Sequence, residues 1–204
     1  MLIVGLTGSI GMGKSTAAAR FRARGYAVFD ADAEVHRLYR EKLAAQIEAA
    51  FPGTTRNGAV DRDRLSAVLI ASPGDFKKLT DIVHPAVRAS ERDFLHQQAR
   101  AGARLAVVEI PLLFENRGDR LVDVVIVVSA DAETQRSRVL QRPGMTAEKL
   151  NALLAWQTPD AEKRRRADFV VDTSGSIAAC DAQIDAIVAN LVSRDGAALA
   201  AHWR

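Results

Sequence analysis

Several features that would narrow the class of protein are scarce in this 204-residue chain. Cys180 is the only cysteine, so no disulfide can form within the chain, and we expect a reduced, cytoplasmic setting. No apolar run approaches the length of a membrane span, and the first residues lead into a strand pattern rather than a basic and then apolar leader. The sequence therefore predicts no association with a membrane.

A strong excess of one charge is also missing. The 28 Lys and Arg residues are dispersed and face 25 Asp and Glu residues, for a net charge of +3. The densest basic run, residues 163–166, is typical of a solvated helix face or a phosphate-facing patch rather than a DNA-binding arm. We expect small-molecule substrates and no nucleic-acid partner.

A phosphate-binding motif lies near the start of the chain. Residues 8–15 read Gly-Ser-Ile-Gly-Met-Gly-Lys-Ser and match the G-x-x-x-x-G-K-[ST] pattern, between a strand pattern and a helix pattern. Glycines let successive N–H groups point at phosphates, and the helix N-terminus adds partial positive charge. Lys14 would then reach the β- and γ-phosphates, and the Ser15 hydroxyl would ligate Mg²⁺. The predicted ATP-binding residues of this loop are Gly11, Met12, Gly13, Lys14, Ser15 and Thr16.

Five continuous apolar, β-branched segments predict a parallel sheet that is covered on both faces. Helical patterns separate them, which indicates an α/β fold of three layers, a P-loop core in which the phosphate loop follows the first strand. In such folds ligands bind beyond the carboxyl ends of the strands. The predicted strands are residues 2–7, 26–30, 104–110, 123–128 and 168–172.

Two segments interrupt this alternation within a single domain over residues 1–204, whose core would be 1–32, 101–130 and 167–192. Residues 33–100 are mostly helical with no obvious strand, broken at Pro52-Gly53, Asn57-Gly58 and Pro73-Gly74, and predict an inserted helical subdomain. Residues 131–166, in which Arg142-Pro143-Gly144 separates two helices, predict a mobile lid.

The last part of the chain predicts one more helix and a tail. We expect residues 193–204 to be loosely held. An apolar stripe at helical spacing marks the buried face of the helix before it: Ile177, Cys180, Ile184, Ile187, Val188 and Leu191.

The acids at strand ends are the best candidates for chemistry outside the loop. Asp30-Ala31-Asp32 follows the second strand, and a phosphotransferase needs a carboxylate to accept or orient the proton of the attacking hydroxyl. Helix capping is the alternative, because Asp is a favoured N-cap. Glu109 also ends a strand, and whether Glu109 or Asp30 helps to hold Mg²⁺ stays open at this point.

Further polar residues carry weaker signals. His84 has no second ligand at metal spacing and is expected to form hydrogen bonds instead. Residues 111–115, Pro-Leu-Leu-Phe-Glu, either line an acceptor pocket or belong to the core. Arg138 and Arg142 share one face of a predicted helix and suit a phosphate or a stacked base, with a solvated helix face as the alternative.

The chain lacks Asn-Lys-x-Asp, the guanine-selecting motif of GTPases, and also the second, early lysine of partition-type ATPases. A small-molecule kinase is therefore favoured over a regulatory switch protein.

The order of its motifs resembles the dephospho-coenzyme A kinase family over nearly the whole chain. The motifs that carry this resemblance are residues 5–15, Asp30-Ala31-Asp32, Val83-His84-Pro85, residues 110–115, Gln135 with Arg138 and Arg142, Gln157, and residues 167–172.

The resemblance implies a nucleotide core, a helical CoA-binding region and a lid, and transfer of the ATP γ-phosphate to the ribose 3′-hydroxyl of dephospho-CoA, the last step of coenzyme A synthesis. It also implies that Asp32 acts as the base, that Arg138 meets the transferring phosphate and that Arg142 meets the adenine. The substrate side would include Thr7, His84, Leu112 and Glu115.

The sequence departs from the family pattern at three positions: Ser9 stands where a second glycine is frequent, Thr173 stands where asparagine is common, and Trp156 beside Gln157 has no interpretation within the pattern. Another nucleotide or nucleoside kinase is the first alternative, and a nucleotide-dependent binding protein is the second. The chain is expected to be a monomer or a weak homo-oligomer.

Overall fold

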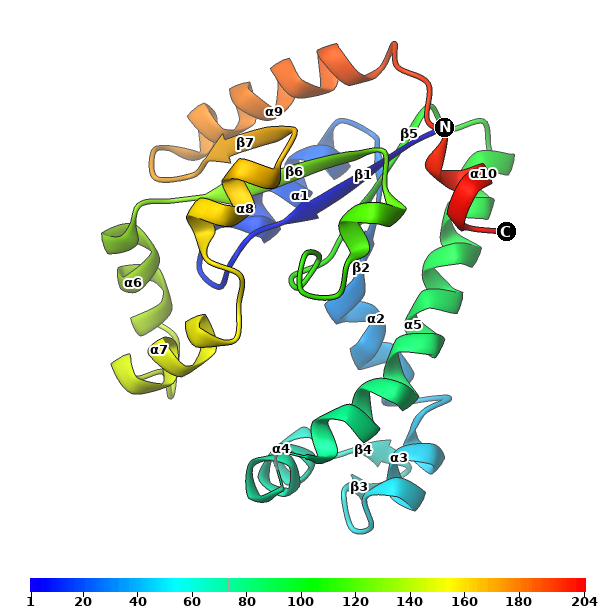
Figure 1. Ribbon diagram of the computed structural model, residues 1–204, viewed down its shortest axis with the longest axis vertical. Helices are drawn as coiled ribbons and strands as arrows, with labels where there is room; N and C mark the ends of the chain where they lie inside the picture. The colour runs from blue at the N-terminus through cyan, green and yellow to red at the C-terminus, as the bar shows by residue number, and fades with distance from the viewer. Residues whose placement is uncertain (73) are drawn as a thin grey trace. The chain divides into compact units, whose positions relative to one another are not determined.

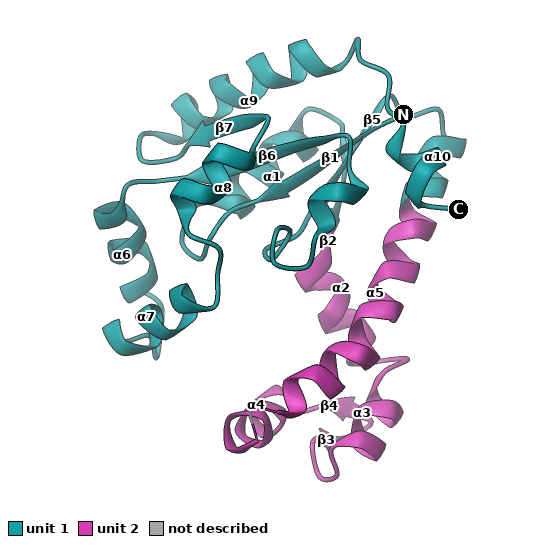
Figure 2. Cartoon of the chain, in the orientation of Figure 1, with its two compact units in different colours: residues 1–29, 95–204 teal, residues 30–94 magenta. Residues whose placement is uncertain are grey.

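The fold is described from a computed structural model of the chain, in which residues 1–72 and 74–204 are described (Figure 1). Pro73, part of one predicted helix break, lies outside the described residues. The chain divides into two compact units, residues 1–29 with 95–204 (unit 1) and residues 30–94 (unit 2), coloured separately in Figure 2. Each unit is described by itself.

The main sheet follows from the five apolar segments. Its strand order is β2-β5-β1-β6-β7, with β1 pairing in parallel to β5 and β6, and β6 in parallel to β7. All five predicted strands are confirmed to within one residue at each end. The strands are β1 (Leu2–Thr7), β2 (Ala27–Asp30), β5 (Leu105–Glu109), β6 (Val124–Ser129) and β7 (Phe169–Asp172).

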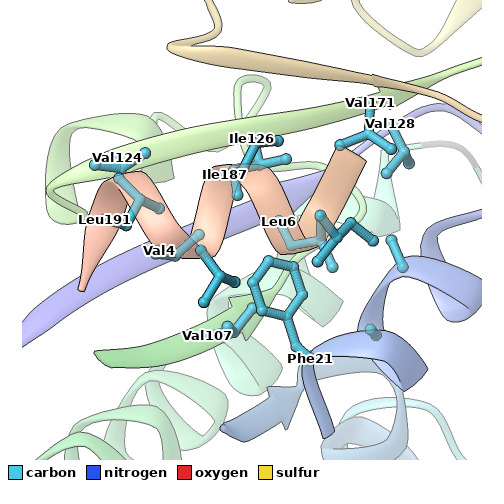
Figure 3. Close-up of a cluster of buried hydrophobic side chains, with 14 of the residues drawn as sticks. Val4, Leu6, Phe21, Val107, Val124, Ile126, Val128, Val171, Ile187 and Leu191 are labelled. Carbon is cyan, nitrogen blue, oxygen red and sulfur yellow. The ribbon is translucent and has the colours of Figure 1, made fainter. Parts of the chain in front are cut away.

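The principal core lies between one face of this sheet and helices α1 (Lys14–Ala23) and α9 (Ile177–Leu191). Figure 3 shows Phe21 of α1 and Ile187 and Leu191 of α9 facing the sheet residues Val4, Leu6, Val107, Val124, Ile126, Val128 and Val171. Cys180 is buried in this core, as expected. Ile177 is 68% exposed, so its place in the buried stripe was predicted wrongly: it is the first residue of the helix and points away from the core.

Shorter helices complete unit 1. The helix break predicted at Arg142-Pro143-Gly144 is confirmed, because it lies between α6 and α7. None of the helices in the described residues is long and apolar enough to cross a membrane. These shorter elements are η1 (Gly118–Leu121, a 3₁₀ helix), α6 (Ala132–Leu140), α7 (Ala147–Ala155), α8 (Asp160–Arg166) and α10 (Ala198–His202).

The C-terminal segment is ordered, which contradicts the prediction of a loosely held tail. Asp123 accepts hydrogen bonds from the backbone N–H groups of Ala197 (2.6 Å), Ala198 (2.8 Å) and Ile3 (2.8 Å). Trp203 is 2% exposed, and its indole N–H donates to the Leu121 carbonyl at 2.8 Å. Tertiary contacts of this kind leave no periodic pattern in a short alanine-rich segment, so the sequence could not reveal them.

Unit 2 is helical with one short hairpin that the sequence did not predict. Asn57 and Gly58 both have positive φ (52° and 76°) and form its turn, as a two-residue type I′ turn requires. Its core gathers Leu38, Leu43, Ile47, Phe51, Leu65, Leu69 and Val83. The elements are α2 (Ala31–Leu38), α3 (Ala44–Ala50), β3 (Thr55–Arg56), β4 (Ala59–Val60), α4 (Arg62–Ala71) and α5 (Asp75–Arg100), whose last residues belong to unit 1.

One carboxyl of α5 is buried beside an arginine. Glu91 is 3% exposed, and its Oε2 lies 3.2 Å from a guanidinium nitrogen of Arg88, while Oε1 has no hydrogen-bond partner among the described residues. Burial disfavours the ionised form and raises the pKa of Glu91 from its ordinary value of 4.5 to about 7, although the Arg88 charge opposes this shift. The folded chain therefore keeps a proton on Glu91 in a pH range in which the unfolded chain has lost it.

This proton makes stability dependent on pH in a defined direction. Because the folded pKa is raised, the stabilising contribution is complete below pH 4.5 and is lost as the pH rises through about 7. We expect Glu91→Gln, which cannot ionise, to gain stability relative to the parent chain by on the order of 3 kcal/mol between pH 4.5 and pH 8. Urea denaturation at both pH values measures the difference, with exposed Glu133→Gln as the control. A difference that stays constant with pH would refute the assignment.

Candidate active site

The phosphate loop has the backbone geometry of an anion site. Gly11 and Gly13 have φ values of 78° and 85°, which side chains rarely adopt, and α1 begins directly after them. The N–H groups of Met12 and Thr16 are bonded within the loop, to the carbonyls of Ser9 and Gly13. The N–H groups of residues 11, 13, 14 and 15 have no acceptor among the described residues. Four donors therefore remain for an anion at the positive end of the helix.

Two side chains follow these donors. Lys14 is half-buried, and within the described part of the chain its ammonium group has no hydrogen-bond or ion-pair partner. Ser15 is exposed in the first turn of α1. An unpartnered cation and an accessible hydroxyl at this place are what nucleotide phosphates and an associated Mg²⁺ require.

Two glutamine side chains hold the backbone of the loop at Ile10. The amide nitrogen of Gln135 in α6 donates to the Ile10 carbonyl at 2.8 Å, and the Ile10 N–H donates to the side-chain oxygen of Gln157 at 3.2 Å. From the sequence, both glutamines are known only as part of the family resemblance, without a role. Their contacts with Ile10 could not be predicted, because both lie far from it along the chain and no spacing rule links them to the loop.

Arg138 lies beside the same loop. Its guanidinium donates to the carbonyl of Thr173 at 2.6 Å and to the Thr173 hydroxyl at 3.2 Å. That hydroxyl lies 2.8 Å from the Met12 carbonyl in the loop. Arg142 lies beyond the end of α6 and is exposed. The predicted arginine pair thus divides into one residue beside the loop and one in solvent.

The segment after β5 is partly core and partly surface. The Thr7 hydroxyl, fully buried at the end of β1, donates to the Pro111 carbonyl at 3.2 Å and ties the two strand ends together. Leu113 and Phe114 are buried in a second core cluster, whereas Leu112 is 38% exposed. Of the two alternatives for residues 111–115, the core therefore holds for Leu113 and Phe114, and Leu112 stays available to a ligand.

Glu115 forms a buried ion pair. Lys163 is fully buried, and its ammonium nitrogen lies 3.1 Å from Oε1 of Glu115, which also accepts the Thr158 N–H at 2.7 Å. Burial pushes the pKa of Glu115 upward, but the backbone N–H groups of Glu115 and Thr158, with Lys163, outweigh burial and leave that pKa below its ordinary value. The expectation that residues 163–166 form a solvated helix face is therefore wrong for Lys163.

Glu109 is also buried close to a basic side chain. Its carboxylate is 5% exposed, and a guanidinium nitrogen of Arg22 lies 3.8 Å from its Oε2. Among the described residues no group of three or more His, Cys, Asp or Glu side chains forms a metal cage.

A surface groove begins at the first turn of α1. It has a volume of about 480 Å³ and runs between α1 and α9, with Ser15 and Thr16 at its wall together with the exposed Ile177. The remaining lining residues are Ala19, Arg20, Ala23 and Asp181.

The other candidates, Asp32 and His84, belong to unit 2. Asp30 caps α2, since its carboxylate accepts the Ala33 N–H at 2.9 Å. Asp32 is exposed in the first turn of α2, and its carboxylate has no partner in the described residues. His84 is exposed on α5. Helix capping thus explains the presence of Asp30, whereas no contact in the described residues explains that of Asp32.

The Glu115–Lys163 pair gives a test of burial. We expect Glu115→Gln to destabilise the fold by about 3–5 kcal/mol, because it leaves the buried Lys163 charge unpaired. Adding Lys163→Met to that variant should restore most of the loss. Urea denaturation measures the free energy of unfolding, with Lys77→Met as a control, since the exposed Lys77–Asp81 pair should change it by less than about 1 kcal/mol. Additive effects of the two buried substitutions would contradict this account.

Comparisons with known proteins agree over most of the chain. A sequence model of the family described as dephospho-CoA kinase matches residues 2–179. The dephospho-CoA kinase of Brucella melitensis is 52% identical over 198 residues, covering 97% of this chain and 99% of the relative.

Solved structures are also similar over most of the chain. The crystal structure of a Thermus thermophilus protein is similar with a TM-score of 0.80 and 36% identity, covering 93% of this chain and 97% of the other. The dephospho-CoA kinase of Campylobacter jejuni is similar with a TM-score of 0.65 and 25% identity, covering 93% and 96%.

Proposed function

The chain belongs to the dephospho-CoA kinase family, and from this premise we propose that it transfers the γ-phosphate of ATP to the ribose 3′-hydroxyl of dephospho-CoA, giving coenzyme A and ADP. The observation that carries the proposal is the phosphate loop. Four N–H groups of the loop and the ammonium group of Lys14, none of which has a partner in the part of the chain that the structure describes, form a cationic cradle at a helix N-terminus. Such a cradle suits the phosphates of ATP.

On the donor side, the N–H groups of residues 11, 13, 14 and 15 would hold the β-phosphate, and Lys14 would offset the charge of the β- and γ-phosphates. The groove of about 480 Å³ that starts at Ser15 and Thr16 is a place for the adenosine, with the exposed Ile177 as an apolar wall. Arg142, exposed beyond α6, would reach the adenine from the lid.

Mg²⁺ is the metal that such a site would use, and the donor set fits it. Mg²⁺ is usually held by one or two protein oxygens together with substrate phosphates rather than by a protein cage. The exposed Ser15 hydroxyl at the start of α1 is the protein ligand that this arrangement needs. When bound, Mg²⁺ would neutralise charge on the phosphates.

On the acceptor side, Asp32 would orient the 3′-hydroxyl and accept its proton. Its carboxylate has no partner among the residues that the structure describes, whereas the neighbouring Asp30 is used as a helix cap. Leu112 would contact the acceptor directly, and His84 is a second proposed substrate-binding residue. Thr7 and Glu115 would act by holding the segment 111–115 in place.

The chemistry is an in-line displacement that depends on positioning and charge neutralisation. A bond forms between the 3′-oxygen and the γ-phosphorus, and the bond from that phosphorus to the β–γ bridging oxygen breaks. The proton of the hydroxyl passes to Asp32, and ADP leaves. Arg138 would meet the transferring phosphoryl group and, with the lid, exclude water.

The proposal assigns roles to the larger segments as well. Residues 131–166 act as the lid, and the mostly helical residues 33–100 bind the CoA moiety of the acceptor. The single, buried Cys180 agrees with a cytoplasmic location. A monomer or a weak homo-oligomer remains the expected state.

The first test is ADP release from Mg-ATP with dephospho-CoA, AMP, adenosine, pantetheine phosphate or no acceptor, with the product mass measured in the same tubes. We expect only dephospho-CoA to stimulate release and coenzyme A to form. Stimulation by another acceptor would keep the kinase and replace the substrate. Release that does not depend on an acceptor, or no release, would overturn the proposal.

A substitution at Asp32 tests the base. We expect Asp32→Asn to lower kcat by 10²-fold or more, because it removes the proton acceptor, while the affinity for ATP measured by calorimetry stays within about twofold. Asp30→Asn is the matched control, since asparagine also caps helices well and should leave kcat nearly unchanged. An unchanged kcat in Asp32→Asn would remove Asp32 from the mechanism.

A further inference from the structure

Thr173 joins three segments of unit 1 at one hydroxyl group. This residue follows β7 and is 5% exposed. Its Oγ1 lies 2.8 Å from the Met12 carbonyl of the phosphate loop and 3.2 Å from the Ser129 carbonyl at the end of β6. A hydroxyl carries one proton, so it donates to one carbonyl at a time, and the Met12 carbonyl is the nearer.

The same hydroxyl accepts a hydrogen bond from the lid helix. One guanidinium nitrogen of Arg138 donates to Oγ1 at 3.2 Å, and the other terminal nitrogen donates to the Thr173 carbonyl at 2.6 Å. The backbone of Thr173 is itself fixed, because its N–H donates to the Ser129 carbonyl at 2.8 Å. Arg138 is therefore held by a residue that the central sheet already holds.

Thr173 also packs directly on the loop. A Cβ added to Gly13 would lie 3.1 Å from Oγ1 and 3.3 Å from the methyl carbon of Thr173. Gly13 is the residue before Lys14, in a left-handed conformation. Thr173 thus contacts the loop at the point where the chain turns into α1.

The hydrogen bonds of Arg138 in the described residues both end on Thr173, and Arg138 forms no ion pair there. A guanidinium has five N–H donors, so three remain for an anion. A long side chain loses about 2 kcal/mol of rotamer entropy when it is fixed, and this cost falls on binding or catalysis unless the protein has already ordered the side chain.

We propose that Thr173 is a positioning residue that holds the guanidinium of Arg138 beside the phosphate loop before ATP arrives, and that it does so through its hydroxyl bonded to Met12. This inference rests on the proposed function, in which Arg138 meets the transferring phosphate. Thr173 itself touches no reacting atom. It acts on the rate through Arg138.

Thr173→Val tests the inference, because valine keeps the shape and the backbone carbonyl and removes only the hydroxyl. We expect kcat to fall about tenfold, with the KM for dephospho-CoA within twofold of the parent value. Thr173→Ser, which keeps the hydroxyl, should stay within threefold of the parent kcat. Thr173→Ala is the second variant, should valine fail to fold beside the unpaired Met12 carbonyl, and it should show the same loss.

A double-mutant cycle with Arg138→Met separates positioning from a purely structural role. If Thr173 acts through Arg138, Thr173→Val adds less than a twofold effect once Arg138 is gone. An equal effect of Thr173→Val with and without Arg138, or an unchanged kcat in the single variant, would overturn the inference. Thermal midpoints of all variants check that each is folded.

The parent chain is measured first with dephospho-CoA, so that failure of the proposed function is recognised separately. The cycle is then repeated on the affinity for Mg-ATP by calorimetry, which needs no acceptor. There we expect about a threefold weakening by Thr173→Val that vanishes in the Arg138→Met background. Additive effects on affinity would overturn the coupling even if another acceptor proves to be the substrate.

Discussion

The phosphate loop can present its backbone to an anion only because side chains from distant segments hold its peptide groups. Gln135 binds the Ile10 carbonyl, Gln157 binds the Ile10 N–H, and Thr173 binds the Met12 carbonyl. A glycine-rich loop has a high conformational entropy when it is free. Each of these hydrogen bonds therefore reduces the number of backbone conformations that the loop can adopt before any ligand binds. Among the described residues, the N–H groups of residues 11, 13, 14 and 15 remain without an acceptor and are therefore available to a ligand.

Four basic residues of unit 1 differ in whether their charge is paired with a carboxylate. Lys163 and Arg166 belong to the structure: Lys163 pairs with Glu115, while Arg166 pairs with Asp119 at 2.9 Å and lies over the Phe114 ring. Within residues 1–72 and 74–204, Lys14 has no partner, and the hydrogen bonds of Arg138 go to one hydroxyl and one carbonyl. Two residues of the basic run in α8, Lys163 and Arg166, therefore fasten this helix to residues 114–119.

The sequence could predict the parts of the fold that depend on local pattern. Continuous β-branched segments gave the strands of the main sheet, and the glycine spacing gave the loop, because both are written in neighbouring residues. It could not predict burial decided by a distant partner, as for Lys163 beside Glu115 or Trp203 bonded to Leu121. The candidate site shows the same limit. Lys14 and Ser15 follow from the motif, whereas the roles of Gln157 and Thr173 depend on contacts that no spacing encodes.

The order in which the chain is made has a consequence for the loop. Residues 8–15 leave the ribosome early, but Gln157 and Thr173, which hold them, follow only after most of the chain. At synthesis rates of about 5–20 residues per second, roughly eight to thirty seconds separate Ser15 from Thr173. During this time β1 also lacks β5 and then β6, its two neighbours in the sheet. ATP therefore cannot guide the early nascent chain, and it stabilises only the completed fold, by mass action.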